Sequence, residues 1–154
     1  MHFAASTGDL AKVRRLIAQD AKVDQRDAQE MTPLMLAAKA GHARVMLLLI
    51  MSGATESATN QAGHTPLIMA AENGKTEAAE VLIELGRMPL LSSKLSRLDR
   101  EIFAKFTPEM LKRMTFDIKV NHQDMTGETA LMKAAKAGHT DVSKMLKIRI
   151  STKS

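Results

Sequence analysis

The chain has 154 residues and a net charge of +5, with 45% hydrophobic and 25% charged residues, a balance typical of one soluble globular domain. It contains no cysteine, Trp or Tyr, which excludes disulfides, thiolate metal sites and a cysteine nucleophile, and favours an aliphatic core of close-packed helices. The most apolar run, at 45–51, is shorter than the roughly 20 residues that a membrane span needs. We therefore expect a helical protein of the cytoplasm or, alternatively, the nucleus.

One sequence pattern recurs along the chain. Segments that begin at Thr32, Thr65 and Thr129 align as TPLMLAAKAGH, TPLIMAAENGK and TALMKAAKAGH. The start of the chain fits the same frame, with Ala4 and Ala5 at the positions of the paired alanines. Because self-similarity at a fixed period marks a repeat architecture, we interpret each copy as one structural unit.

Each copy predicts two short helices joined by a turn. A Thr followed by Pro, as at Thr32 and Pro33, is typical of an N-cap and the first helical residue. The paired alanines allow a neighbouring helix to approach closely, and the next glycine, such as Gly41, ends the helix by adopting positive φ. A second apolar helix follows, for example over residues 42–51.

Residues 87–116 depart from this pattern. The first copies are 33 residues apart, yet the two AAKAGH hexapeptides start 97 residues apart, two fewer than three full periods. The segment is still predicted to be helical, since Leu95, Leu98, Ile102 and Phe106 line one helix face. We interpret it as a degenerate fourth repeat with a longer first helix, in preference to a flexible insertion, because it is rich in large apolar residues.

The period of 33, the T-P-L motif, the paired alanines and the Gly-His step resemble the ankyrin repeat over nearly the whole chain. The resemblance implies an all-α solenoid in which each repeat is a β-turn followed by two antiparallel helices. We expect one domain, 1–154, with repeats at about 1–26, 27–59, 60–91, 92–123 and 124–148 and a basic tail at 149–154. Polar residues on the outer flanks of the first and last repeats predict a complete, capped stack of five: Lys12, Arg15, Ser143 and Lys147.

The resemblance also implies a binding surface, because ankyrin-like stacks use their turn tips and the outward side of the first helices, which form a concave face. Carried over position by position, it points to thirteen residues: Ala28, Gln29, Met31, Lys39, Gln61, Ala62, His64, Glu72, Asn73, Met125, Thr126, Glu128 and Lys136. The fourth repeat departs from the motif, so none of its residues is transferred. The expected function is a protein-interaction module, acting as a scaffold, an adaptor or an inhibitor that occludes its target, and we expect a monomer.

Two alternatives stay open at this point. Leu47 and Met51 stand where the third copy has Glu80 and Glu84, which suggests either isolated exposed apolar residues or a contact with a partner or a second copy of the chain. Separately, the basic segment from Arg87 to Arg113, together with the basic tail, predicts binding to nucleic acid or another acidic partner as a second functional interpretation.

We expect no cofactor, no metal and no catalytic site, and therefore no small-molecule substrate. The string Gly74-Lys75-Thr76 copies the end of a phosphate-binding loop, but Met69 stands where that motif requires its first glycine. No two of the five histidines have the i, i+4 spacing of a helical zinc site. We interpret the histidines as structural and turn residues.

Overall fold

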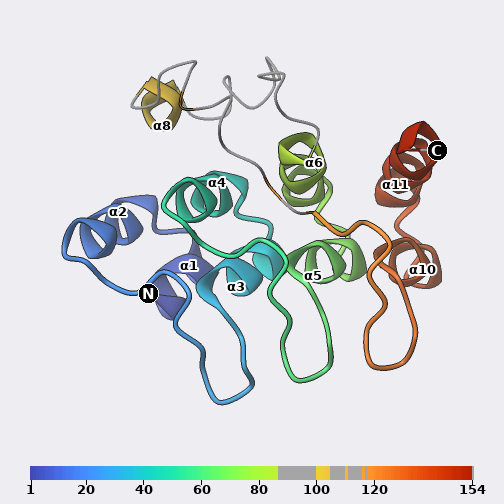
Figure 1. The fold of residues 1–154 in the computed structure, drawn as a ribbon, viewed down its shortest axis with the longest axis horizontal. Helices are drawn as coiled ribbons and strands as arrows, with labels where there is room; N and C mark the ends of the chain where they lie inside the picture. The colour runs from blue at the N-terminus through green and yellow to red at the C-terminus, as the bar shows by residue number, and fades with distance from the viewer. Residues whose placement is uncertain (87–99, 105–109, 111–115, 117, 154) are drawn as a thin grey trace.

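The structure is a computed structural model that describes residues 1–86, 100–104, 110, 116 and 118–153. Two layers of helices stand above a row of protruding loops, and the helices of each layer lie side by side in chain order (Figure 1). The inner layer contains α1 (His2–Thr7), α3 (Pro33–Ala40), α5 (Pro66–Glu72) and α10 (Ala130–Lys136). The outer layer contains α2 (Leu10–Ala18), α4 (Ala43–Met51), α6 (Thr76–Leu85) and α11 (Thr140–Lys153), and the short helix α8 (Arg100–Ala104) contacts α4.

The inner helices begin as the sequence predicts. The hydroxyls of Thr32, Thr65 and Thr129 accept hydrogen bonds from the backbone N–H three residues later, at 3.3, 3.2 and 3.3 Å. Pro33 and Pro66 occupy the first helical position, where the missing amide costs nothing. The inner helices α3, α5 and α10 are therefore each fixed at their start by a threonine that the repeat supplies, whereas α1 starts after Met1 without a side-chain cap.

The glycine that follows each inner helix packs, in the first and third repeats, against a side chain of the next repeat in the stack. A Cβ atom added to Gly8 or Gly74 would lie 2.7 or 2.6 Å from the ring of His42 or His139, respectively, and both glycines have positive φ. The Nε2 atom of His42 lies 3.1 Å from the carbonyl oxygen of Ser6, and that of His139 lies 3.1 Å from the carbonyl oxygen of Glu72. These histidines are thus structural, as predicted, and join neighbouring repeats.

The core lies between the two layers and between successive repeats. Ala37, Ala38, Ala70 and Ala71 are fully buried, because α3 lies between α1 and α5, and α5 lies between α3 and α10. Larger aliphatic side chains fill the space between the inner and outer helices: Leu34, Met35, Met46, Leu49, Ile68 and Leu82. The alanines permit the close approach of inner helices that the sequence predicts.

The last repeat packs directly on the third one. Helix α5 contacts α10, α6 contacts α11, and the amide of Met125 donates to the carbonyl oxygen of Ala62 at 3.0 Å. These contacts leave no fourth repeat stacked between the third and the last one, whereas the division of the chain into five repeats, with a degenerate one at 92–123, stays a prediction. The physical reason is that the glycine, alanine and histidine positions of the third and last copies complement each other. Most of the predicted long helix of the fourth copy lies outside the described residues, which include α8.

Leu47 and Met51 do not form an exposed apolar pair, so that alternative is wrong, and with it the suggested self-association through them. Their exposed fractions are 0% and 8%. They are buried because α4 is covered by its neighbours, since it contacts α2, α6 and α8. The isolated sequence could not show this, because α8 belongs to the irregular segment.

The outer flanks of the first and last repeats only partly follow the prediction. Lys12, Arg15 and Lys147 are exposed, but Ser143 is buried and donates its hydroxyl hydrogen to the carbonyl oxygen of His139 at 2.9 Å. Within the part of the chain that the structure describes, no helix is both long enough and apolar enough to cross a membrane.

Candidate functional site

The loops below the helices share one local construction at their tips. The Oδ1 atom of Asp27 accepts hydrogen bonds from the amides of Gln29 and Met31, at 2.9 Å each. In the next tip Oδ1 of Asn60 does the same for the amides two and four residues later, both at 3.0 Å. Asp124 repeats the pattern in the last tip, at 2.9 and 3.0 Å. Because Asx side chains satisfy the turn amides, each tip has a fixed shape before any partner arrives.

A groove of about 650 Å³ lies between the tip at Asp27, the tip at Asn60 and the helices α3 and α5. We call these the second and third tips, after the repeats to which they belong. Its apolar lining comes from Met31, Leu36 and Met69. Seven of the thirteen residues predicted to bind a partner line it: Gln29, Met31, Lys39, Ala62, His64, Glu72 and Asn73. The prediction thus points to one continuous hollow, although Met31 is buried and offers little surface itself.

The other predicted residues lie outside the groove. Ala28 and Gln61 are exposed at the tips, where the Nε2 atom of Gln61 donates to the carbonyl oxygen of Ala28 at 3.2 Å. Met125 and Thr126 are exposed in the last tip, with 78% of Met125 accessible. The remaining two, Glu128 and Lys136, form an ion pair with each other at 3.0 Å. Lys136 is thus ion-paired, although 74% of its side chain remains exposed.

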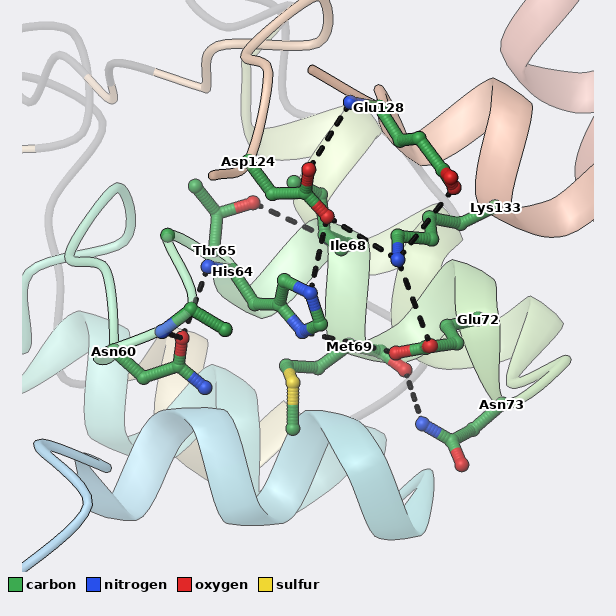
Figure 2. A network of polar contacts seen from close by, with 12 residues as sticks. Asn60, His64, Thr65, Ile68, Met69, Glu72, Asn73, Asp124, Glu128 and Lys133 are labelled. Carbon is green, nitrogen blue, oxygen red and sulfur yellow. Dashed lines mark hydrogen bonds and ion pairs between the residues drawn. The ribbon is translucent and has the colours of Figure 1, made fainter. Parts of the chain in front are cut away.

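A cluster of charged side chains joins the third repeat to the last one (Figure 2). The carboxylate of Asp124, whose side chain is 0% exposed, lies 3.2 Å from Nζ of Lys133 and 3.1 Å from Nε2 of His64. Lys133 Nζ also lies 3.5 Å from Glu128 and 3.9 Å from Glu72, and the His64 ring lies 3.7 Å from Glu72. Figure 2 shows these side chains converging from α5, α10 and the two tips. We call these residues and Lys136 the junction cluster.

Burial and partners determine the charge states in the junction cluster. Burial opposes ionisation of Asp124, but hydrogen bonds from Thr126 and Glu128 and the contact with Lys133 outweigh it and hold its pKa far below the ordinary value. Burial likewise opposes the charged form of Lys133, yet its contacts with Asp124 and the other carboxylates raise its pKa. A hydrogen bond from Lys136 lowers the pKa of Glu128. The buried pair of Asp124 and Lys133 is therefore ionised at neutral pH.

The cluster joins the third and last repeats through contacts between charged side chains. Among the residues that the structure describes, no group of three or more His, Asp or Glu side chains is placed to hold a metal ion. Each carboxylate of the cluster faces a lysine ammonium instead. What this arrangement offers chemically is a fixed pattern of charge beside an apolar hollow.

Sequence reasoning missed the residues that organise the site. Asp27, Asn60 and Asp124 occupy the same repeat position, so a short Asx side chain in one column was the available signal for the tip turns. Lys133 stands where the other copies have Leu36 and Met69, and a charge in an otherwise apolar column was the signal for a buried ion pair.

Comparison with known proteins agrees with this architecture. A family profile described as "Ankyrin repeats (3 copies)" matches residues 1–90, and one described as "Ankyrin repeat" matches residues 126–149. The two matches leave out most of the segment that departs from the repeat pattern. The direct contact of the third repeat with the last one therefore coincides with the places where the family pattern stops and resumes.

Curated relatives show the same resemblance. The Caenorhabditis elegans homolog of transient receptor potential cation channel subfamily A member 1 is 29% identical over 147 residues, which is 94% of this chain and 12% of that protein. The human member of that name is 37% identical over 54% of this chain and 8% of its own length. Mouse ankyrin repeat domain-containing protein 63 is 35% identical over 57% of this chain and 22% of its own length.

The chain thus spans less than a quarter of the length of these relatives, which carry the repeats within much larger proteins. What these relatives share with the chain is the repeat itself. With a family profile covering more than half of its residues, and with stacked helix pairs, capping threonines and glycine turns in the predicted places, the chain belongs to the ankyrin-repeat family.

Proposed function

We propose that this chain acts as a protein-interaction module that binds a protein partner in the groove between the second and third tips. Ankyrin repeats are in general modules for protein–protein interaction, and the groove is the observation that carries the proposal for this chain. In this role the chain is a scaffold, an adaptor or an inhibitor that occludes its target, and it works by binding without chemistry. The proposal places it in the cytoplasm or the nucleus.

Two physical properties of the groove support this proposal. The tips that flank it are held by Asx hydrogen bonds and by contacts with each other, so little conformational entropy is lost when a partner binds. The lining combines apolar side chains, such as Leu36 and Met69, with polar ones, such as Lys39 and Asn73. A hollow with an apolar base and a few placed polar groups is typical of a specific binding site.

A charge reversal in the groove tests the proposal. Lys39 is exposed on the groove wall, so Lys39→Glu should alter capture of partner proteins from a lysate of the native cell at least tenfold without changing the melting temperature. Lys147→Glu, which makes the same charge change on the outer helix α11, is the matched control. Capture should be quantified by mass spectrometry of photo-crosslinked partners.

The same two variants separate the second interpretation from the first. If Lys147→Glu weakened binding while Lys39→Glu had no effect, the groove would be rejected and the basic surface would be favoured. Binding through phosphate contacts would also fall steeply with added salt, whereas binding to a protein in the groove should depend weakly on salt.

A further inference from the structure

The junction cluster contains more negative than positive charge. Its three carboxylates, from Asp124, Glu128 and Glu72, face two ammonium groups, from Lys133 and Lys136. Asp124 lies 3.2 Å from Lys133, and Glu128 lies 3.0 Å from Lys136. Glu72 has only the two longest contacts, 3.9 Å to Lys133 and 3.7 Å to His64. Among the described residues, Glu72 is therefore the carboxylate of the cluster with the longest ion-pair contacts.

This carboxylate belongs to the groove. Glu72 lines the groove at the end of α5, and its side chain is 40% exposed. Within the described residues no hydrogen bond to its carboxylate oxygens is present. A carboxylate beside an apolar surface attracts a cation more strongly than one in open water, because the local dielectric constant is lower. The strongest binding partner for such a group is a guanidinium, which can donate two parallel hydrogen bonds.

An apolar row runs from the groove toward the first repeat. Phe3, Leu36 and Met69 occupy the same position in three successive repeats, on the inner helices α1, α3 and α5, which pack side by side. Phe3 is 72% exposed and Leu36 is partly buried, whereas Met69 is only 5% exposed, so Phe3 and Leu36 supply the accessible apolar surface of the row. The row ends where Lys133 replaces the apolar residue, next to Glu72. A partner segment lying along the inner helices would thus meet apolar surface first and the carboxylate last.

We propose that the groove recognises a partner segment with apolar side chains followed by a cationic side chain, preferably arginine, that pairs with Glu72. This inference depends on the proposed use of the groove as the partner site. The apolar side chains lie on Phe3 and Leu36, and the stem of the arginine passes over Met69 toward Glu72, since long cationic side chains cover apolar surface with their methylene groups. The guanidinium completes the charge balance of the junction cluster.

Selection of peptides on the full chain tests this inference. A phage-displayed library of random 12-residue peptides is selected on the immobilised protein, and enriched peptides are synthesised with a fluorescent label for anisotropy measurements. We expect enrichment of peptides with an arginine or lysine after apolar residues, and at least tenfold weaker binding to Glu72→Gln. Glu77→Gln, on the first turn of α6 and outside the groove, is the matched control and should leave binding unchanged.

A double-mutant cycle then identifies the contact itself. Replacement of the peptide arginine by citrulline, a neutral isostere, should weaken binding about as much as Glu72→Gln, and the two changes together should cost little more than either one. Thermal melting of Glu72→Gln shows whether the variant is folded. Additive losses, or enriched peptides that bind in the groove without a cationic residue, would overturn the inference and leave the proposed function standing.

The groove itself is checked with Gln29→Arg, on its wall, and Gln19→Arg, which follows α2 and lies outside it. We expect only the first variant to weaken binding of the enriched peptides. If neither Gln29→Arg nor Lys39→Glu had an effect, or if no peptide were enriched, both the inference and the proposed binding face would be overturned.

Discussion

Two junctions between repeats can be compared: the one between the second and third repeats and the one between the third and last repeats. Equivalent helices pack against each other at both, but the side chains in the contact differ. At the first one Lys75 covers Gly41, and the Nδ2 atom of Asn60 contacts the sulfur of Met31 at 3.3 Å. At the second one a histidine ring covers the glycine, and the buried pair of Asp124 and Lys133 lies between the tips. The second junction thus differs from the first by a pair of opposite charges, Asp124 and Lys133, that is largely shielded from solvent.

The difference follows from the way the chain connects the repeats. Residues 52–65 link α4 to α5, whereas residues 86–129 separate α6 from α10. Bringing together partners about three times further apart along the chain costs roughly 1 kcal/mol more in chain entropy. Where the connection no longer enforces adjacency, side chains have to select the correct partner. The comparison shows that two repeats can stack when their surfaces match, even when they are not consecutive along the chain.

Removal of the Asp124 side chain should have the largest effect. Asp124→Ala leaves Lys133 buried with a weakened partner set and leaves two turn amides without their acceptor, so we expect a loss of about 3 kcal/mol in the free energy of unfolding. Asp27→Ala removes the same turn acceptor without a buried cation and should cost about 1 kcal/mol. Urea denaturation followed by circular dichroism measures both, and equal losses would contradict the assigned difference between the junctions.

Alanine substitutions at the glycines that follow the inner helices should reduce stability by different amounts, depending on which side chain packs against each glycine. Gly138→Ala should cost about 1 kcal/mol for the left-handed backbone alone, because no atom lies within 4 Å of its added Cβ. Gly74→Ala should cost about 1 to 2 kcal/mol more, because its Cβ would meet the ring of His139 at 2.6 Å. Gly41→Ala should fall between them, since Lys75 is flexible and can move. Melting temperatures of the three variants give the order, and a loss for Gly138→Ala as large as that for Gly74→Ala would reject direct stacking on the third repeat.

Acid should weaken the second junction selectively. The pKa of Asp124 is lowered from the ordinary value of 3.8, so its contribution is complete above pH 3.8 and is lost as the pH falls below that value. The difference in unfolding free energy between the natural chain and Asp124→Asn should therefore be constant from pH 7 to 5 and shrink by up to about 1.4 kcal/mol per pH unit below pH 3.8. Because the pKa of Lys133 is raised from 10.5, its contribution should persist at neutral pH and disappear only above that value. A difference that did not change down to pH 2.5 would argue against an ionised Asp124 in the folded chain.

The smallest predicted effect makes the first junction resemble the second. In Lys75→His the new ring should cover Gly41 and reach the carbonyl oxygen of Lys39, which corresponds to the Glu72 oxygen used by His139. We expect a gain of about 0.5 to 1 kcal/mol from this added hydrogen bond. The reverse change, His139→Lys, should cost a similar amount. Chemical denaturation of both variants measures the pair, and a loss in both would show that each junction depends on its own residue.

Much of the fold could be predicted from local sequence signals. Thr32 with Pro33 predicted a helix start, and Gly41 predicted its end, because capping and positive φ are local properties of the backbone. Lys39, His64 and Glu72 occupy defined positions of a recurring unit, which is why the sequence could place them on one face, and their use in binding stays a prediction. The fate of the irregular segment was not predictable, because apolar spacing shows that a helix can form but not which surface it covers. Leu47 illustrates this, since its burial depends on packing against distant elements.

The sequence by itself determined the repeating unit, namely its length, its helix caps, its paired alanines and its glycine turns, because caps and turns depend on residues that are close together along the chain. Only the tertiary structure decided which repeats are neighbours, because that choice depends on complementary surfaces that are far apart along the chain. It placed His139 against Gly74 and enclosed Asp124 and Lys133 between the third and last repeats. The same packing gives Glu72, in the groove, the longest ion-pair contacts among the described carboxylates of the junction cluster.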